Sequence, residues 1–305
     1  MEYRQLGHAG PQVPVLGLGA WPLGGGMGTV DERDAINTIH AALDHGITLI
    51  DTAQGYLDSE RIIGKALKHG RRDGCFLATK VSGRFSRQDI LAAIEASLRA
   101  LDVDYVDLYQ IHWWDPAYPI EESMATLAQL QAEGKTRFIG VSNFNAEQMR
   151  QALAAARFHA NQPAYNLFDR QIEAEDLPFC QQHGIGVLAH SPLAKGLLAG
   201  RYTPNHRFAP DDERSTFARF QGEAFARYLA AADRLKAIAQ ERGLTMVQFA
   251  VAWVLRLPAV TCALVGARSP AQVAEFAGAV GVRFSPEELA QIDAILHDAP
   301  NLPPG

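Results

Sequence analysis

The chain has 305 residues, 48% of them hydrophobic and 20% charged, which is a globular composition with ample material for a large core. Its formal net charge of −6 gives no support to binding of nucleic acid or of membrane surfaces in general. The three cysteines have no metal-ligand spacing and the N-terminal residues lack the pattern of a signal peptide, so we expect a cytoplasmic protein.

Short apolar runs alternate with amphipathic segments almost from end to end. The residues through Val13 predict a small β-hairpin over one end of the fold. Eight near-continuous apolar runs then predict strands buried on both faces, at residues 15–18, 48–53, 76–81, 106–112, 138–142, 159–162, 186–189 and 261–265. Helical periodicity predicts helices between them, at residues 31–45, 59–69, 86–101, 120–133, 146–157 and 172–183.

Local signals mark several helix ends. Ser86 predicts the start of one helix, and Ser285 followed by Pro286 predicts the start of the last. Glycines, which favour the left-handed conformation that ends helices, follow four of the helical segments, at Gly46, Gly70, Gly134 and Gly184.

Eight strands that alternate with helices predict an α/β fold with a parallel sheet. We expect a (β/α)8 barrel of the TIM type, with an N-terminal β-hairpin, long loops at its C-terminal face and a single domain over residues 1–305. The segment 202–222 is polar and without periodicity, and is either a long functional loop or a floppy insertion.

Barrels of this kind carry their functional side chains at the C-terminal ends of the strands. Polar residues end nearly every apolar run of this chain, and chance would scatter them over both ends of the barrel. They are Asp51 with Tyr56 in the following loop, Lys80, His112, Ser142 with Asn143, Gln162, His190 and Arg268.

Four of these residues predict proton transfer to a substrate. A tyrosine has an ordinary pKa of about 10, and a nearby ammonium such as that of Lys80 should lower the pKa of Tyr56. Asp51 can hold Lys80 in its charged form, and His112 can position a substrate oxygen. Each residue alone favours a structural interpretation, as a cap, a rim aromatic, a solvated strand end or a core histidine. Together they favour function, and no metal is required.

The chain resembles the aldo-keto reductase superfamily in motifs that stand in family order from about Tyr3 to Ile295. They include Asp51-Thr-Ala-Gln-Gly-Tyr56, Ala78-Thr-Lys80, Gln110-Ile-His112-Trp113, Gly140-Val-Ser-Asn143-Phe, Gln162-Pro-Ala-Tyr-Asn166, Ser191-Pro-Leu-Ala-Lys-Gly-Leu-Leu198 and Gly266-Ala-Arg268. The strongest likeness is to the bacterial general stress and inositol-operon reductases.

The resemblance implies an enzyme that moves hydride between a nicotinamide and a carbonyl or alcohol, with NADP(H) preferred over NAD(H). It implies a catalytic tetrad of Asp51, Tyr56, Lys80 and His112, in which Tyr56 is the general acid and base. Substrate contacts are expected from Trp21, Tyr56, His112 and Trp113. Cofactor contacts are expected from Gly19, Ala20, Asp51, Ser142, Asn143, Gln162, His190, Ser191, Leu193, Gly196, Gly266, Arg268, Gln272 and Glu275.

By resemblance, Ser142, Asn143 and Gln162 bind the nicotinamide carboxamide, the segment 191–197 binds the pyrophosphate and Arg268 binds the 2′-phosphate of the adenosine. Gln272 and Glu275 match ribose and adenine contacts. The chain departs from the family pattern at three positions: His190 replaces the usual stacking aromatic, Phe276 replaces a common asparagine, and Leu57 replaces a common glycine.

Two other functions fit the same residues. One is a cofactor-binding regulatory or sensor module that resembles the β subunits of potassium channels. The other is an aldolase that uses Lys80 as a Schiff base, which pairing with Asp51 disfavours. The glycine run at 24–28 predicts a flexible first loop and not a phosphate loop, and residues 211–214 predict a solvated stretch or a segment that folds over the cofactor. We expect a monomer, and the substrate and the direction of reaction stay open.

Overall fold

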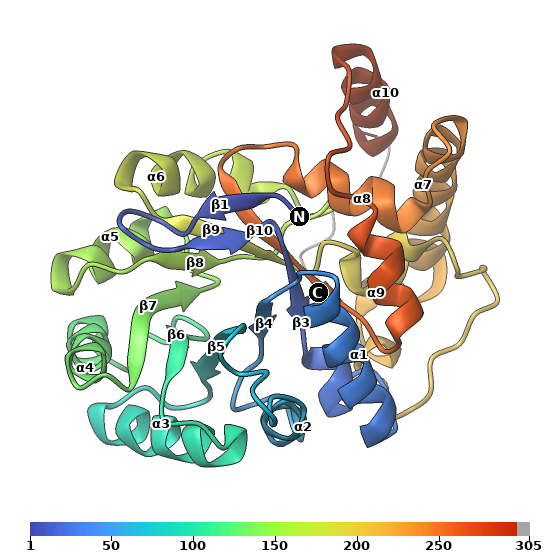
Figure 1. Cartoon of the computed structure of the whole chain (residues 1–305). Helices are drawn as coiled ribbons and strands as arrows, with labels where there is room; N and C mark the ends of the chain where they lie inside the picture. Colours follow the sequence, from blue (N-terminus) through green and yellow to red (C-terminus); the bar gives the residue numbers. More distant parts are fainter. Residues whose placement is uncertain (298–305) are drawn as a thin grey trace.

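Eight parallel strands close into a ring in the computed structural model of this chain, which describes residues 1–297 (Figure 1). β10 pairs with β3 on one side and with β9 on the other, which closes the barrel. The strands are β3 (Leu16–Gly19), β4 (Leu49–Asp51), β5 (Phe76–Val81), β6 (Val106–Ile111), β7 (Thr136–Ser142), β8 (Ala160–Gln162), β9 (Gly186–His190) and β10 (Val260–Gly266). The predicted barrel is confirmed.

Two strands have other bounds than predicted, because the backbone pairing does not begin or end where the apolar run does. β7 begins at Thr136, two residues before the apolar run, because Thr136 pairs in register with Val106 of β6. β4 ends at Asp51 and not at residue 53, although Thr52 and Ala53 are buried. Ladder hydrogen bonds are made by the backbone, so an apolar run does not by itself set where pairing stops.

Helices surround the barrel (Figure 1). They are α1 (Glu32–Asp44), α2 (Ser59–Ala66), α3 (Arg87–Leu101), α4 (Ile120–Ala132), α5 (Ala146–Ala155), α6 (Asp176–His183), α7 (Gly222–Glu241), α8 (Met246–Leu255), α9 (Pro270–Ala277) and α10 (Pro286–His297). Ser86 caps α3 by accepting a hydrogen bond from the N–H of Asp89, and Ser285 accepts one from the N–H of Glu288 at the start of α10. The four glycines predicted at helix ends all have positive φ.

The predicted helix over 172–183 is wrong in its first turn. The chain there forms a short 3₁₀ turn, η2 (Gln171–Glu173), and α6 begins only at Asp176. Glu173 is held by the guanidinium groups of Arg170 and Arg256, and Glu175 has a non-helical φ of −132° that interrupts the helix.

Two apolar clusters form the core. The larger lies between the barrel and the helices, and the smaller fills the barrel interior with residues such as Leu108, Leu188 and Leu264. The hairpin of β1 (Tyr3–Gln5) and β2 (Gln12–Pro14) contributes Leu6 and Val13 to the interior cluster, so it covers one end of the barrel as predicted. The functional end is therefore the other one, where the strands point.

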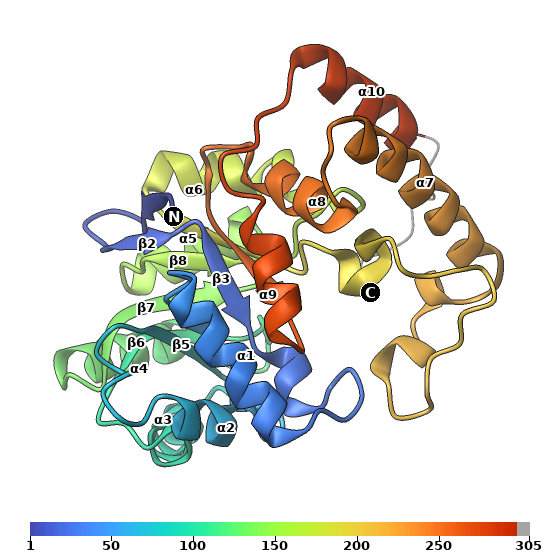
Figure 2. The ribbon, with the colours of Figure 1, turned by 45° about the vertical axis from the view of Figure 1, so that its right-hand side comes forward.

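The segment 202–221 leads from η3 (Ala194–Ala199) to α7 and contains two further 3₁₀ turns, η4 (Glu213–Ser215) and η5 (Ala218–Phe220) (Figure 2). Both nitrogens of the Arg219 fork donate to the Asp169 carboxylate, at 2.7 and 2.9 Å, and both side chains are buried. Of the two interpretations open from the sequence, the structure favours an ordered loop over a floppy insertion.

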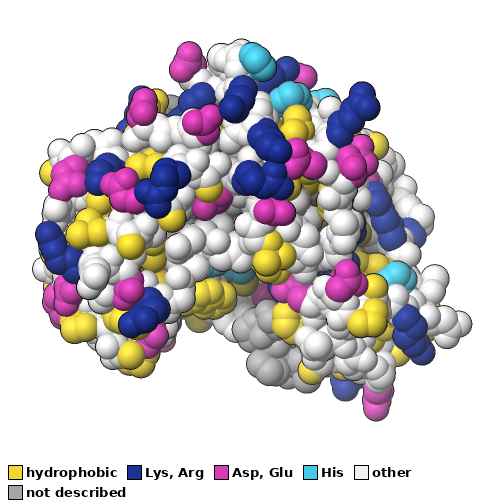
Figure 3. Space-filling view, turned by 90° about the horizontal axis from the view of Figure 1, so that it is seen from below, with side chains coloured by type: hydrophobic (Ala, Val, Ile, Leu, Met, Phe, Trp, Pro, Cys, Tyr) yellow, Lys and Arg dark blue, Asp and Glu magenta, His cyan; other side chains and the backbone are white. Residues whose placement is uncertain are grey.

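The molecular surface carries charges of both signs. On the face shown in Figure 3, basic and acidic side chains are interspersed among polar and apolar ones. No helix within residues 1–297 is long and apolar enough to cross a membrane. The single domain predicted over 1–305 includes residues 298–305, which lie outside the described part of the chain.

Candidate active site

The carboxyl ends of the strands surround a cavity of about 680 Å³. Six predicted cofactor residues are each the last residue of a strand and line this cavity: Gly19, Asp51, Ser142, Gln162, His190 and Gly266. The same cavity is lined by eleven more of the predicted site residues: Trp21, Tyr56, His112, Trp113, Asn143, Ser191, Leu193, Gly196, Arg268, Gln272 and Glu275. Residues distant in the chain are thus brought to one end of the barrel.

Two predicted site residues do not line the cavity. Lys80 is fully buried beneath it, in contact with residues that do line it. Ala20 is also fully buried, and its backbone N–H donates to the carbonyl of Asp51 while its own carbonyl accepts from the Ser59 hydroxyl. These bonds hold the chain between β3 and α2, so the geometry gives no support to a contact between Ala20 and a cofactor.

Lys80 lies between Asp51 and Tyr56. Its ammonium Nζ donates to Oδ1 of Asp51 at 2.6 Å and to the carbonyl of Thr52 at 2.8 Å, and lies 3.5 Å from the hydroxyl of Tyr56. Burial is the largest single influence and would lower the pKa of Lys80, but Asp51 and Tyr56 together outweigh it, so the pKa of Lys80 is raised. Lys80 therefore stays an ammonium, as its pairing with Asp51 led us to expect.

The pKa of Tyr56 runs against the expectation from sequence. Burial raises it, the ammonium of Lys80 lowers it, and the carboxylate of Asp51 raises it again, with a net raised pKa. The expected lowering by Lys80 is present, but burial, which the sequence does not show, outweighs it together with the neighbouring carboxylate. Tyr56 accordingly holds its proton at neutral pH, which is the form that a proton donor needs.

The second oxygen of Asp51 is held by amide groups. Oδ2 accepts from Nε2 of Gln162 at 2.8 Å and from Nε2 of Gln110 at 3.5 Å. The carbonyl of Gln162 accepts in turn from the hydroxyl of Ser142 at 2.9 Å. These bonds tie the ends of β4, β6, β7 and β8 together and fix the carboxylate that holds Lys80.

His112 is an uncharged imidazole at the cavity wall. Burial, the charge of Lys80 and the neighbouring His190 lower its pKa to about 2. Its Nδ1 lies 2.9 Å from the hydroxyl of Ser82, which also accepts a hydrogen bond from the backbone N–H of Gly55 at 3.2 Å. Ser82 lines the cavity as well, and sequence analysis missed it because a single serine after a strand carries no pattern.

His190, at the position where the family usually has an aromatic side chain, is part of a polar network. Its Nε2 lies 2.8 Å from the amide oxygen of Asn143, so that nitrogen carries the proton, and its Nδ1 lies 3.0 Å from the hydroxyl of Ser191. Burial lowers the pKa of His190 to about 3, which keeps it neutral. The Asn143 amide nitrogen donates to the carbonyl of His112, at 3.1 Å.

The remaining part of the cavity suits a phosphate-bearing ligand. Lys195, Arg201, Arg214 and Arg268 all line it, and cationic side chains of this kind bind phosphate oxygens. Ser191, Ala194 and Lys195 adopt left-handed φ of 56°, 47° and 53°, which bends the backbone of the loop after β9. The amide and hydroxyl groups at the strand ends and these cations fit a nicotinamide dinucleotide.

Arg268 and its neighbours are engaged with protein groups. The guanidinium of Arg268 donates to the carbonyls of Met27 and Thr29, at 3.2 and 2.5 Å. The side-chain oxygen of Gln272 accepts from the backbone N–H of Arg268 at 2.7 Å. Glu275 forms an ion pair with Arg201 at 2.7 Å. Phe276 is buried and contributes to the core beside this group.

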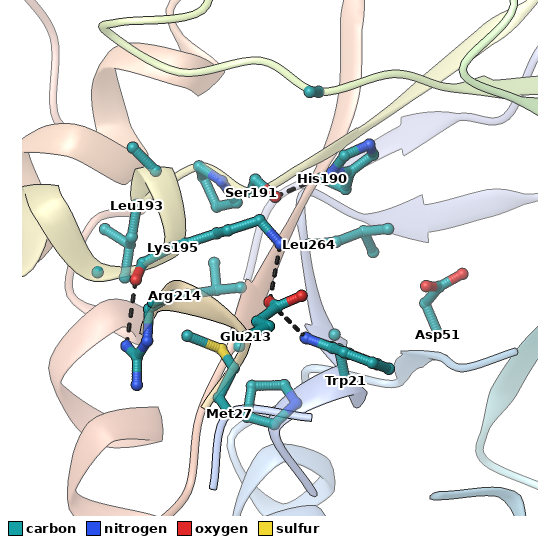
Figure 4. Close-up of a pocket in the computed structure, with 18 of the residues that line it drawn as sticks. Trp21, Met27, Asp51, His190, Ser191, Leu193, Lys195, Glu213, Arg214 and Leu264 are labelled. Atoms are coloured by element: carbon teal, nitrogen blue, oxygen red, sulfur yellow. Dashed lines mark hydrogen bonds and ion pairs between the residues drawn. The ribbon is translucent and has the colours of Figure 1, made fainter. Parts of the chain in front are cut away.

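The prediction of a solvated stretch over residues 211–214 is wrong for its centre. Asp212 and Arg214 are buried and paired with each other at 2.5 Å, and Glu213 accepts hydrogen bonds from Trp21 and Lys195 (Figure 4). Sequence periodicity could not show this, because the partners of Glu213 lie 192 and 18 residues away. Residues 1–297 contain no group of His, Cys, Asp and Glu side chains that could hold a metal ion.

Comparison with known proteins gives one consistent family. The model of the aldo/keto reductase family matches residues 15–297. A protein of Bacillus subtilis (strain 168), Aldo-keto reductase YhdN, is 41% identical over 319 residues, covering 100% of this chain and 96% of that protein. The NADH-specific methylglyoxal reductase of Escherichia coli (strain K12) is 34% identical over 312 residues, covering 93% and 95%. The structure of glycerol dehydrogenase AKR11B4 from Gluconobacter oxydans has a TM-score of 0.87 and 38% identity, covering 99% and 96%.

Proposed function

The chain belongs to the aldo/keto reductase family, and from that membership we propose that it reduces aldehydes or ketones to alcohols, or catalyses the reverse, with NADP(H). The observation that carries this proposal is the position of Lys80, whose ammonium lies between the Asp51 carboxylate and the Tyr56 hydroxyl at the base of the cavity. A bound nicotinamide would supply or accept the hydride.

The side chains of the site carry out proton transfer and orient the substrate. Tyr56 gives its hydroxyl proton to the carbonyl oxygen during reduction, and Lys80 stabilises the phenolate that is left. Asp51 holds Lys80 in place and in its charged form. His112, which is neutral, donates a hydrogen bond to the same substrate oxygen and orients it. The reverse reaction returns the proton from the alcohol to Tyr56.

Ser142, Asn143 and Gln162 supply the polar groups for the carboxamide of the cofactor, and His190 stands at its ring. The loop 191–197 and the cations around it fit a pyrophosphate, and Arg268 fits a 2′-phosphate. The preference for NADP(H) rests on Arg268, whereas the Escherichia coli relative is by its name NADH-specific. Both cofactors therefore belong in the test.

The alternatives are weaker on the same geometry. A Schiff base at Lys80 needs a neutral amine, and the Asp51 pairing keeps this lysine charged. A purely regulatory module would not need Asp51, Tyr56 and Lys80 arranged for proton transfer at the base of the cavity. We also infer a cytoplasmic monomer of one domain, related to the bacterial general stress and inositol-operon reductases.

The decisive experiment compares the unaltered protein with Tyr56→Phe on a panel of aldehydes and NADPH. We expect NADPH fluorescence to change on binding in both proteins, and turnover to fall by about a thousandfold or more in the variant, because general acid catalysis contributes on the order of 10²–10⁴. Near-normal turnover in Tyr56→Phe would contradict the assignment of the proton donor. Borohydride trapping of substrate on Lys80 would support the aldolase instead.

A further inference from the structure

Glu213 joins walls of the cavity that come from different parts of the chain (Figure 4). Its Oε1 accepts hydrogen bonds from the indole Nε1 of Trp21 and from the ammonium of Lys195, each at 2.8 Å. Trp21 lies in the loop after β3, Lys195 lies in the loop after β9, and Glu213 itself lies in the long segment before α7. One carboxylate oxygen thus links three loops around the cavity.

The indole ring of Trp21 packs against Tyr56 and Gly26, and its N–H group makes a polar contact that orients the ring. Its ring meets the ring of Tyr56 edge-on, with centroids 4.9 Å apart and an interplanar angle of 64°. The backbone of Gly26 also lies against the indole, since a Cβ atom at Gly26 would come within 2.1 Å of it. The indole N–H is the polar group of this side chain, so the bond to Glu213 sets which edge of the ring faces the cavity.

The neighbours of Glu213 hold the segment in place. Arg214 pairs with Asp212, donates to the hydroxyl of Tyr202 at 2.6 Å and donates to the carbonyl of Lys195 at 3.2 Å. Met27, in the loop after β3, forms a β-bridge with Asp212. Glu213 therefore reaches Trp21 from a backbone that is tied to both of the loops that it links.

We propose that Glu213 is a positioning residue for Trp21, and that it thereby sets how well bulky carbonyl substrates fit beside Tyr56. The proposal rests on the proposed carbonyl reductase function, in which Trp21 forms a wall of the substrate pocket. Loss of the carboxylate removes the acceptor of the indole N–H, and the ring loses its fixed orientation. Binding of a substrate that packs on the indole suffers most. Proton transfer from Tyr56 is affected less, because the Glu213 carboxylate raises the pKa of Tyr56 by less than burial and Asp51 do.

The kinetic test uses Glu213→Ala, Trp21→Phe and the double variant, with 4-nitrobenzaldehyde as the bulky substrate and propanal as the small one. Hydrogen bonds to charged groups contribute enough that Glu213→Ala should raise KM for 4-nitrobenzaldehyde by about tenfold, with a much smaller change for propanal and little change in kcat. Trp21→Phe should act similarly. The double variant should be no worse than the single ones, because both remove the same contact. Additive losses would overturn the proposal.

Two further variants separate positioning from charge and from folding. Glu213→Gln keeps an oxygen that can accept from the indole, so it should retain most of the binding that Glu213→Ala loses. Asp211→Asn removes the same charge at an exposed position in the same segment and should leave KM unchanged. Thermal unfolding of each variant shows whether it is folded. A loss in Asp211→Asn equal to that in Glu213→Ala would mean that net charge, and not the contact, is responsible.

A spectroscopic comparison tests the contact without any turnover. The chain has four tryptophans, and Trp21→Phe identifies the indole N–H signal of Trp21 in a ¹⁵N–¹H correlation spectrum. Glu213→Ala should shift that signal upfield and leave the other three in place. An unmoved Trp21 signal would overturn the proposal. Absence of turnover in the unaltered protein, with the expected shift present, would instead contradict the proposed function while supporting the role of Glu213 in holding Trp21.

Discussion

The hydroxyl of Ser82 lies 2.9 Å from Nδ1 of His112, so these two groups share a hydrogen bond. Oγ of Ser82 also accepts a hydrogen bond from the N–H of Gly55, and we infer that it donates its own single proton to Nδ1. A neutral imidazole whose Nδ1 accepts a hydrogen bond carries its own proton on Nε2. In this tautomer His112 can donate a hydrogen bond into the cavity that it lines, which is the role that we propose for it.

Ser82→Ala should lower kcat by about three- to tenfold, the effect of losing one hydrogen bond of about 1 kcal/mol. The Kd of NADPH should stay unchanged, because Ser82 acts on His112. Ser82→Thr, which keeps the hydroxyl, should restore most of the activity. The ¹⁵N shifts of the His112 ring report the tautomer directly, and an unchanged tautomer together with unchanged kcat in Ser82→Ala would contradict this role.

The free energy of unfolding should decrease as the pH is lowered, because two half-buried histidines resist protonation in the folded protein. The folded protein holds the pKa of His112 at about 2 and that of His190 at about 3, whereas an unfolded histidine titrates near 6.5. Below about pH 6.5 the unfolded chain therefore binds protons that the folded protein does not. Each such histidine costs up to about 1.4 kcal/mol of stability per pH unit, which is regained as the pH rises.

Urea unfolding at pH 7, 6 and 5 measures this effect. Carboxylates also contribute to the slope, so the comparison is with His190→Phe, which removes one of the two groups and keeps an aromatic ring. The free energy of unfolding of this variant should depend less steeply on pH than that of the unaltered protein. Parallel curves would contradict the lowered pKa of His190 in the folded protein.

The strand-end residues could be predicted because two independent signals agree on them. Asp51, Lys80 and Gln162 each end or lie near the end of an apolar run, and the parallel barrel brings all such ends to one side. The buried ion pair of Asp51 and Lys80 follows from that arrangement and from the cost of burying either charge alone.

What could not be predicted depends on contacts between loops. Glu213 meets Trp21 across 192 residues, and neither the loop lengths nor any periodicity fixes that approach. The raised pKa of Tyr56 could not be foreseen either, because burial of the phenol is its largest cause and the sequence does not show how deeply that side chain is buried. Periodicity in the sequence predicts the alternating strands and helices of the barrel. It does not predict the conformations of the connections after β3 and β9, which depend on contacts between loops.

Arg268 should distinguish the two nicotinamide cofactors. Its guanidinium now donates to the carbonyls of Met27 and Thr29, and the same fork can bind a phosphate dianion with greater strength. Arg268→Ala should raise the Kd of NADPH by about ten- to a hundredfold and that of NADH by much less. Arg283→Ala, which removes an exposed guanidinium paired with Glu2, serves as the charge control. Equal effects of Arg268→Ala on both cofactors, measured by fluorescence titration, would remove the case for NADP(H).

Leu57 holds a backbone conformation that its side chain disfavours. It follows Tyr56 with a left-handed φ of 49°, at the position where the family commonly has glycine, and its side chain is 68% exposed. A left-handed residue with a Cβ atom costs about 1–2 kcal/mol, and glycine avoids that cost. Leu57→Gly should therefore be more stable than Leu57→Ala by about 1 kcal/mol, although glycine is the poorer choice at ordinary positions. Urea unfolding measures the free energy of unfolding of the two variants. Both variants lack the exposed leucine side chain, so the difference between them reports the backbone conformation. If Leu57→Ala is the more stable one, the backbone beside Tyr56 is not left-handed in solution.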